Sequence, residues 1–426
     1  MRTILVTAYA VNPYKGSEEG TGWNLTAQIA LNNKVVAVTR KNNRGDIERY
    51  MQANCLLMPH IENITFLYFD LPKWAIAWKK GPLLSALYFY MWQFFVALWL
   101  MSKKVDFDIA HSLNFHSNWT PSFLWMLGKP FVWGPVGNHT KIPKQYIKNI
   151  YGTKAFLKDR MLWYVKCWFW NVDPFVYICK TKAQKIFCVN TEAIKRLNIP
   201  VDKAVMLPAV ASEQVEGMAT SADGKFTVLS VGRFVPLKGF DLAIKAFGLF
   251  YNNLRVDQKA DANLLIIGTG PEKQRLQNMI ADMGLTQVIT IKEWMPRNEV
   301  IQRFGSSSAY LFPSHEGAGM VVAEALSYGI PVVCLDNYGP GEYVHPQSKL
   351  KVKQGCYNET ASKLAMRLFR LYSYTAFYQT EQRLAKARYN EFFQWKCKGE
   401  VFNAVYNAVE GENAHANQSV NIIQTA

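Results

Sequence analysis

Two glutamates eight positions apart, Glu316 and Glu324, form the pattern in this chain that best predicts chemistry. An apolar run, 309–313, precedes them, and the segment 327–333 follows with a glycine and a proline before two valines. This order predicts a strand, a glycine loop, a helix, a glycine stop and a second strand. The loop lets backbone amides approach a ligand, and the helix start favours an anion. The arrangement suits a ligand with both phosphates and hydroxyls, such as a sugar nucleotide.

A cationic pair follows another predicted strand. Arg233 and Lys238 lie five positions apart on a loop that opens a helix, where a planar fork and a compact charge can hold a diphosphate. The alternative is a pair of solvated surface cations. Gly268 ends a further strand with a glycine turn. The loop 10–24, which contains Gly16, lacks the G-x-G-x-x-G spacing of a dinucleotide fingerprint, and this disfavours an NAD-linked oxidoreductase.

Short apolar strands alternate with helical stretches along the chain. The predicted strands are Ile4–Ala10, Val35–Thr39, Ile64–Phe69, Asp108–Leu113, Phe131–Trp133, Ile186–Val189, Val205–Leu207, Thr227–Val231, Leu264–Ile267, Val288–Ile291, Tyr310–Phe312 and Val332–Leu335. This alternation predicts parallel sheets covered on both faces. Two successive series predict an α/β fold of two doubly wound, Rossmann-like domains that face across a cleft, with ligands beyond the carboxyl ends of the strands.

The polar stretch Ser212–Lys225 marks the boundary between the domains. We expect an N-terminal, acceptor-binding domain over 1–211 and a C-terminal, donor-nucleotide-binding domain over 225–395. We expect 396–410 to form a helix that packs back on the N-terminal domain, and 411–426 to be a disordered tail.

The chain resembles the retaining family-four glycosyltransferases, which have the two-domain B-type glycosyltransferase fold. The resemblance covers nearly the whole chain and is strongest at Glu316 and Glu324, with the following 325–333, and at the segment 232–239. Two N-terminal segments, 16–24 and 130–137, are similar to a bacterial surface-polysaccharide branch of that family.

The resemblance implies roles for matching residues. Arg233 and Lys238 would hold the donor diphosphate, and Glu324 would accept hydrogen bonds from the ribose hydroxyls. Glu316 would contact the donor sugar near the reacting carbon. The remaining donor-binding residues would be Gly16, Gly268, Ala318, Gly319 and Met320. A histidine that faces the anomeric carbon in this family falls on His111, with His116 as the rival and a packed histidine without a role in the reaction as the alternative.

No cofactor or metal is expected, because B-type enzymes stabilise the leaving group with cations and helix termini. Asp106-Phe107-Asp108 has the D-x-D pattern of metal-dependent glycosyltransferases, but it precedes a strand and lacks other ligands. The two glutamates lie on one loop-and-helix unit, which argues against a hydrolase with opposed carboxylates. The seven cysteines form no C-x-x-C pair, which predicts reduced thiols in a cytosolic protein.

The basic character belongs to the first half of the chain. Residues 1–210 contain 26 Lys and Arg against 12 Asp and Glu, a balance of +14 out of the total of +16. This half therefore meets an anionic partner, and without a nucleic-acid module we favour an anionic membrane surface over nucleic acid. Aromatic and basic segments at 74–80 and 154–182 fit a headgroup boundary. The apolar run Leu83–Met101 has the length of a membrane span, but its aromatic residues and flanking lysines favour a core or interfacial helix.

The sequence thus predicts a retaining, hexosyltransferase-type glycosyltransferase that uses a nucleotide-diphosphate sugar and a glycan or lipid-linked acceptor. Its place would be bacterial surface-polysaccharide or lipopolysaccharide synthesis, in the cytoplasm on the inner face of the membrane. The alternative is a catalytically silent sugar-nucleotide-binding or scaffold protein of the same fold. The base, the sugar and the acceptor stay open, although the turn 292–296 is expected to help select the base.

Overall fold

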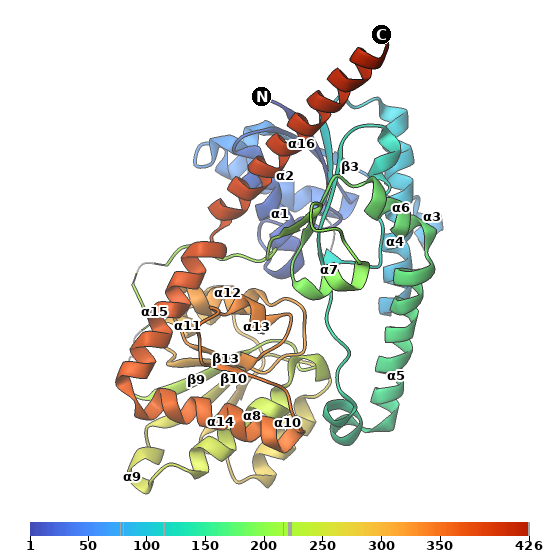
Figure 1. The fold of residues 1–426 in the computed structure, drawn as a ribbon. Coiled ribbons are helices and arrows are strands. Elements are labelled where there is room, and N and C mark those ends of the chain that lie inside the picture. The colour runs from blue at the N-terminus through green and yellow to red at the C-terminus, as the bar shows by residue number, and fades with distance from the viewer. Residues whose placement is uncertain (77, 80, 114–115, 216, 220–223, 425–426) are drawn as a thin grey trace. The chain divides into compact units, whose positions relative to one another are not determined.

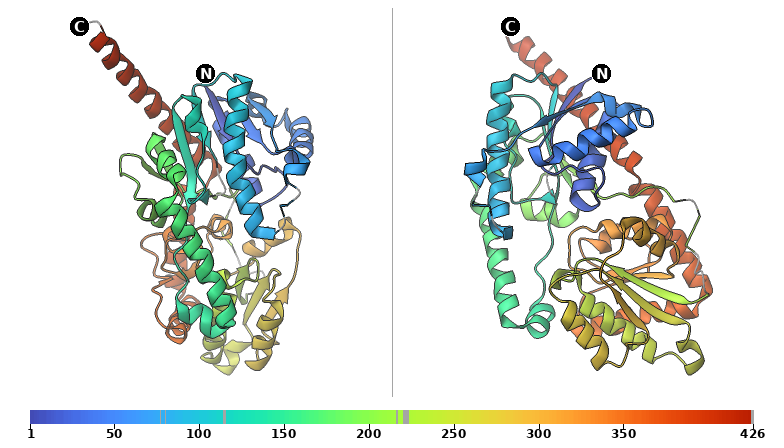
Figure 2. Two further views of the ribbon diagram at one scale, coloured as in Figure 1. Left: turned by 90° about the vertical axis from the view of Figure 1, so that its right-hand side faces the viewer. Right: turned by 180° about the vertical axis from the view of Figure 1, so that it is seen from behind.

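The computed structural model describes residues 1–426 except 77, 80, 114–115, 216, 220–223 and 425–426 (Figures 1 and 2). The chain divides into two compact units. The N-terminal unit contains 1–138, 164–209 and 395–426, and the C-terminal unit contains 139–163 and 210–394.

The N-terminal unit is built on a sheet with the strand order β3-β2-β1-β4-β6-β7-β8, and β5 pairs with β6 beside this path. The described pairings are parallel. Its strands are β1 (Thr3–Thr7), β2 (Lys34–Thr39), β3 (Ile64–Tyr68), β4 (Ile109–Ser112), β5 (His116–Ser117), β6 (Phe131–Gly137), β7 (Lys185–Cys188) and β8 (Ala204–Met206). Its helices are α1 (Ser17–Ala30), α2 (Arg44–Asn54), α3 (Lys73–Ile76), α4 (Gly81–Lys103), the second part of α5 (Lys144–Val172), α6 (Pro174–Lys182), α7 (Thr191–Leu197) and α16 (Trp395–Gln424), with 3₁₀ turns at Lys41–Asn43, Pro59–Asn63 and Leu124–Leu127.

The C-terminal unit repeats this topology with the order β11-β10-β9-β12-β13-β14, again with parallel pairings. Its strands are β9 (Phe226–Val231), β10 (Ala262–Ile267), β11 (Ile289–Lys292), β12 (Ala309–Phe312), β13 (Val332–Leu335) and β14 (Lys351–Val352). Its helices are α8 (Phe240–Asn252), α9 (Val256–Lys259), α10 (Lys273–Asp282), α11 (Arg297–Gly305), α12 (Met320–Ser327), α13 (Pro340–Tyr343), α14 (Tyr357–Ser373) and α15 (Thr375–Phe392), with a 3₁₀ turn at Pro236–Lys238. The predicted α/β class with two doubly wound sheets is confirmed.

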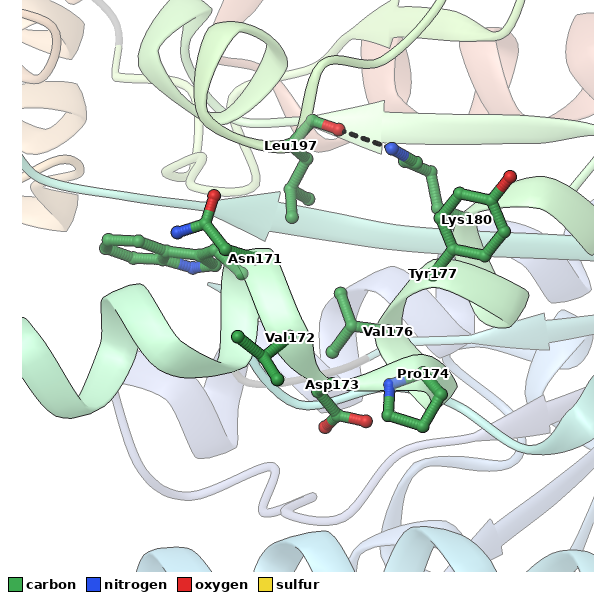
Figure 3. A pocket seen from close by; sticks show the side chains of 9 residues that line it. Asn171, Val172, Asp173, Pro174, Val176, Tyr177, Lys180 and Leu197 are labelled. Carbon is green, nitrogen blue, oxygen red and sulfur yellow. Dashed lines mark hydrogen bonds between the residues drawn. The ribbon is translucent and has the colours of Figure 1, made fainter.

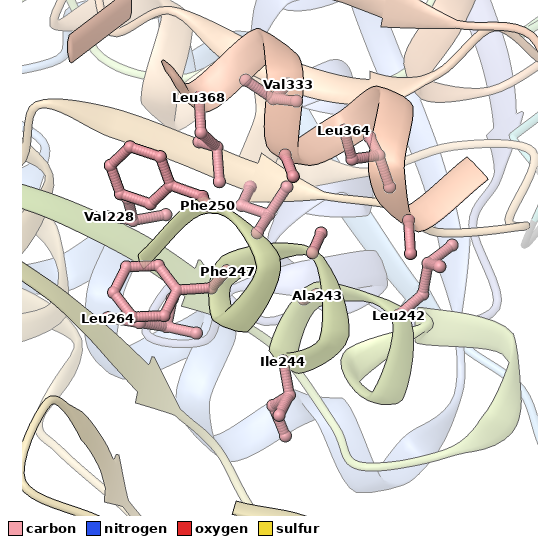
Figure 4. Packing of buried hydrophobic residues seen from close by; sticks show 14 of the residues in the cluster. Val228, Leu242, Ala243, Ile244, Phe247, Phe250, Leu264, Val333, Leu364 and Leu368 are labelled. Carbon is pink, nitrogen blue, oxygen red and sulfur yellow. The ribbon is translucent and has the colours of Figure 1, made fainter. Parts of the chain in front are cut away.

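The strands were predicted from short apolar runs, and this succeeded because they are buried on both faces of each sheet. In the C-terminal unit, Phe247 and Phe250 of α8 pack over Val228 of β9 and Leu264 of β10, and Leu368 of α14 closes the same core (Figure 4). Burial of one such side chain stabilises the fold by about 1.5–3 kcal/mol. Each of the twelve predicted strands overlaps an observed strand, and only the two-residue strands β5 and β14 lack a counterpart among the described strands.

The apolar run predicted as a core or interfacial helix is α4. Tyr88, Trp92 and Val96 on one face are buried in the core of the N-terminal unit, whereas Leu87 and Met101 are exposed. Among the described residues, α4 is also the helix that is long and apolar enough to cross a membrane by length and composition, with 39% of its most apolar window buried.

Two assignments differ from the sequence-based domain division. Residues 139–163 belong with the C-terminal unit, because Ile142, Tyr146 and Ile147 are buried in its core and Tyr146 donates a hydrogen bond to Thr360 at 2.7 Å. The segment 411–424, expected to be a disordered tail, continues α16 as a helix. Once the first part of α16 is packed, each further residue adds one backbone hydrogen bond, so a polar sequence without proline can extend the helix.

Candidate functional site

The candidate site lies at the carboxyl edge of the C-terminal sheet. The neighbouring strands β9 and β12 are the point at which the strand order reverses, and ligands of doubly wound folds bind beyond the carboxyl ends at such a point. The loop after β9 carries Arg233 and Lys238, and the loop after β12 carries Glu316. The predicted strand, loop, helix, stop and strand around Glu316 and Glu324 is therefore observed as β12, α12 and β13.

Lys238 and Glu316 form a direct ion pair. Lys238 Nζ lies 2.6 Å from Glu316 Oε2, with 20% and 14% of the two side chains exposed. Burial raises the pKa of Glu316, and the charge of Lys238 opposes that rise. Glu316 Oε1 is buried and has no hydrogen-bond partner among the described residues. One carboxylate oxygen is thus neutralised by the lysine, and the other keeps an unused capacity to accept a hydrogen bond.

Glu324 has a partner that the sequence analysis missed. Its side chain is 2% exposed, and Oε1 accepts a hydrogen bond from Arg297 Nη2 at 2.6 Å. Arg297 is half-exposed at the start of α11, directly after the turn 292–296. The position of Arg297 directly after the predicted base-selecting turn could have indicated from the sequence that it lies near the site. The contact of Glu324 with donor hydroxyls stays a prediction.

Tyr310 is a buried residue whose pKa both Glu316 and Glu324 affect. Its hydroxyl donates to the Val231 carbonyl at 3.3 Å at the centre of the sheet. Burial and the negative charges of Glu316 and Glu324 raise the pKa of Tyr310 well above its usual value. Both carboxylates therefore act on one buried phenol, which places them in the same region of the C-terminal unit.

The start of α12 lies against Glu316. Gly319 occupies the N-cap position, so the cap residue has no side chain to bond the first-turn amides. A Cβ on Gly319 would lie 3.0 Å from Glu316 Oε1, which shows how closely the helix start approaches the carboxylate. The partial positive charge of a helix N-terminus favours an anion here. The amides of Ala318, Gly319 and Met320 stay predicted ligand contacts.

Gly268 allows two neighbouring loops of the C-terminal unit to pack closely. Its φ is +155°, and a Cβ would lie 1.9 Å from the carbonyl oxygen of Gly232. The glycine therefore lets the loop of β10 close on the loop that carries Arg233. The side chain of Arg233 is exposed, so it is accessible to a diphosphate, and its contact with the donor stays a prediction.

The glycine-rich loop of the N-terminal unit is explained in part by packing. A Cβ on Gly20 would lie 2.2 Å from the Lys15 carbonyl oxygen, and one on Gly22 would lie 2.2 Å from that of Ala10. These glycines let the loop fold against α1. Gly16, predicted to lie against donor phosphates, is the N-cap residue of α1, where its backbone is extended.

The structure corrects the preference for His111 as the histidine at the anomeric carbon. His111 lies within β4 and is fully buried. Its Nε2–H donates to the Gly134 carbonyl at 2.7 Å, and its Nδ1 accepts from the Tyr406 hydroxyl at 2.5 Å. Burial lowers its pKa to about 3, so the ring is neutral. This geometry favours the packed histidine, because both ring nitrogens are hydrogen-bonded to protein groups. His116 lies in β5, and its side chain is outside the described residues.

Metal-ligand clusters are not found in the described part of the chain, where no group of three or more His, Cys, Asp or Glu could hold an ion. In the D-x-D segment, Asp108 Oδ2 accepts a hydrogen bond from the Thr3 amide at 2.7 Å, which ties β1 to the start of β4. A metal-free reaction stays a prediction.

Comparison with known proteins identifies the region that carries this site. Residues 213–376 match the family model described as glycosyl transferases group 1. This region is similar to the group 1 glycosyltransferases. All the predicted donor-binding residues of the C-terminal unit lie inside it.

Curated relatives match this chain over part of their length. An uncharacterized glycosyltransferase of Haemophilus influenzae is 35% identical over 117 residues, which are 27% of this chain and 31% of that protein. The lipopolysaccharide core biosynthesis glycosyltransferase LpsD of Rhizobium meliloti is 26% identical over 171 residues, 40% of this chain and 46% of that protein. The putative colanic acid biosynthesis glycosyltransferase WcaL of Escherichia coli is 29% identical over 171 residues, 38% of each chain. The chain spans less than half the length of these relatives.

Solved structures match the whole fold. Sucrose-phosphate synthase from Thermosynechococcus elongatus has a TM-score of 0.63 at 17% identity, covering 97% of this chain and 100% of that one. The lipopolysaccharide outer core galactosyltransferase WaaB in its apo form has a TM-score of 0.61 at 15% identity, covering 95% and 99%. The fold is therefore the B-type glycosyltransferase fold.

Proposed function

We propose that this protein transfers a sugar, with retention of configuration, from a nucleoside diphosphate sugar to a glycan or lipid-linked acceptor in bacterial surface-polysaccharide or lipopolysaccharide synthesis. The observation that carries the proposal is the Lys238–Glu316 pair with its unbonded Oε1, beside the start of α12 and near Glu324. The names of LpsD and WcaL support the class of product. Two structures similar in fold were solved with bound UDP, which supports the class of donor.

In the proposed reaction, charge develops on the leaving diphosphate while the sugar carbon becomes electron-poor. Lys238 and Arg233 would stabilise the diphosphate, and the helix start at Gly319 would add its partial positive charge. Glu316 Oε1 would accept a hydrogen bond from a donor sugar hydroxyl. The acceptor hydroxyl would attack from the face that the diphosphate leaves, and a phosphate oxygen would take its proton. No metal or cofactor is part of this proposal.

A panel of UDP, GDP and ADP sugars tests the donor. We expect one of them to raise the melting temperature of the wild-type chain and to be hydrolysed slowly without acceptor. Glu316→Gln should lower turnover by about 100-fold or more while the variant stays folded. Lys245→Gln on α8 is the matched control and should react like the wild type. Binding without hydrolysis or transfer would instead support the catalytically silent sugar-nucleotide-binding protein.

The stereochemistry needs its own measurement. Proton NMR of the first product formed should show the same anomeric configuration as the donor. Inversion at that carbon would refute retention and would leave the glycosyltransferase proposal in place.

The exposed face of α5, together with the corner between α5 and α6, supports a peripheral position on an anionic membrane. The first part of this face belongs to the C-terminal unit, and the part from Tyr164 onward belongs to the N-terminal unit. After its break at Gly152, α5 exposes an apolar stripe at helical spacing, and two exposed lysines lie on the same helix. The stripe consists of Leu157, Met161, Tyr164, Trp168 and Val172, each at least half exposed, and the lysines are Lys154 and Lys158. Aromatic and apolar side chains next to lysines match the boundary between headgroups and acyl chains.

A pocket of about 260 Å³ lies at the same corner. In Figure 3, Lys180 points across it to the Leu197 carbonyl, which accepts its hydrogen bond at 2.9 Å, and Tyr177 lies beside the lysine. The pocket therefore offers a polar recess next to the apolar stripe. We propose that this face rests on the inner leaflet of the cytoplasmic membrane. Flotation with phosphatidylglycerol vesicles tests this: wild-type binding should weaken with salt and be lost in Trp168→Glu, and binding equal in both would refute it.

A further inference from the structure

Two cations converge on one phenol at the carboxyl edge of the N-terminal sheet. Arg40 Nη1 and Lys79 Nζ both donate hydrogen bonds to the Tyr9 hydroxyl, at 3.0 and 3.2 Å. The Arg40 guanidinium also lies over the Tyr9 ring, 4.6 Å from its centroid. Two like charges directed at one neutral oxygen repel each other, and an anion bound beside them would lower that cost.

The nearby carboxylate, Asp70, already accepts hydrogen bonds from other groups. Asp70 acts on Lys79, but its two carboxylate oxygens accept hydrogen bonds from the Tyr88 hydroxyl and from the Lys41 amide. Burial and the charge of Arg40 lower the pKa of Lys79, with Asp70 opposing them. An ordinary salt bridge therefore does not explain why these cations are held together.

Arg40 has a donor that the described residues leave unused. Its Nε atom is buried and has no hydrogen-bond partner among them. A buried donor without a partner costs about 1–3 kcal/mol, and such groups call for a ligand or a functional reason. The fork of an arginine can bind two oxygens of a phosphate at once, while a lysine adds a point charge.

The position of the cluster fits a ligand site. Tyr9, Arg40 and Asp70 follow β1, β2 and β3, three adjacent parallel strands, and Lys79 follows the short helix α3. The carboxyl edge of such strands is where doubly wound folds bind ligands. We infer that Arg40 and Lys79 bind a phosphate ester carried by the acceptor, held open by the Tyr9 hydroxyl until the anion arrives. The inference rests on the proposed function and names the chemical class of its acceptor.

Titration with inorganic phosphate and glycerol phosphate by calorimetry tests the site. Arg40→Gln and Lys79→Gln should each weaken phosphate binding by about 10- to 100-fold, because a charge-assisted hydrogen bond is lost. Arg40→Lys retains the charge without the fork and should fall between Arg40→Gln and the wild type. Lys34→Gln is the matched control, since it removes the same charge from the opposite end of β2. Lys238→Gln shows how much of the measured phosphate binding occurs in the donor site.

Two arms distinguish the sources of the phosphate. Binding of the soluble esters that depends on Arg40 assigns a soluble phosphorylated acceptor. Vesicle binding by the chain with Trp168 intact that falls in Arg40→Gln, while the soluble esters do not bind, assigns a lipid phosphate, and either result supports the site. Phosphate affinity that is equal in wild type and Arg40→Gln, or lost only in Lys238→Gln, overturns it. Because this titration needs no donor and wild-type donor hydrolysis needs no acceptor, failure of the site and failure of the proposed function can be told apart.

Discussion

The Lys238–Glu316 pair allows a prediction whose magnitude follows from burial. Lys238→Met leaves Glu316 buried without its cation. The carboxylate can escape its charge by taking up a proton, at a cost of about 1.36 kcal/mol for each pH unit above its ordinary pKa of 4.5. The electrostatic loss in free energy of unfolding is therefore limited to about 4 kcal/mol at pH 7.5 and about 1.4 kcal/mol at pH 5.5.

The sign follows from a carboxyl whose pKa is higher in the folded state than in the unfolded state. Such a group binds more protons when folded, so stability falls as pH rises from 4.5 toward the raised value. Urea unfolding followed by circular dichroism at pH 5.5 and 7.5 measures the difference. Lys238→Met should lose up to about 2.7 kcal/mol more at pH 7.5 than at pH 5.5.

Two controls isolate the electrostatic effect. In the Glu316→Gln background, Lys238→Met should cost the same at both pH values, because only the contact of the Lys238 ammonium with the Phe312 ring is lost. Lys245→Met, on α8 of the same unit, should show no such pH dependence. If Lys238→Met costs the same at pH 5.5 and 7.5 in the wild-type background, Glu316 does not depend on Lys238 for its charge, and the assigned pair is refuted.

Other predictions concern the loop, the buried histidines and the missed arginine. Gly268→Ala should abolish the donor-induced rise in melting temperature, since its Cβ meets a carbonyl oxygen at 1.9 Å, whereas the open helical position of Gly45→Ala should leave that rise intact. Burial lowers the pKa of His111 to about 3 and of His315 to about 4, so each binds a proton mainly when unfolded and stability falls with pH below 6.5. Acidification to pH 5 should cost about 2 kcal/mol for each, and His111→Gln should remove one such contribution in calorimetric unfolding; an unchanged pH slope would contradict this. Arg297→Ala frees Glu324 and should change donor KM by tenfold or less while kcat stays within twofold, in steady-state kinetics; a large loss of kcat would instead place Arg297 at the reacting centre.

The apolar runs predicted nearly all of the fold, because a strand buried on both faces must be apolar along its length and its ends are marked by glycine and polar residues. The exceptions have physical causes. The strands β5 and β14 have two residues each, too few for a period. Residues 139–163 belong to the C-terminal unit because Ile142 and Tyr146 are buried in its core. The spacing of residues along the chain does not predict which core they join.

At the site, the sequence by itself determined which residue types meet at the carboxyl edge of the C-terminal sheet, because strand ends and loop positions follow from local patterns. Glu316, Glu324 and Lys238 were found in this way. Only the tertiary structure decided how their charges are shared: Lys238 pairs with Glu316, and Arg297 pairs with Glu324. It also decided that the ring of His111 accepts a hydrogen bond from Tyr406 of α16. Hydrogen bonds between residues 295 positions apart are set by packing and not by neighbours in sequence.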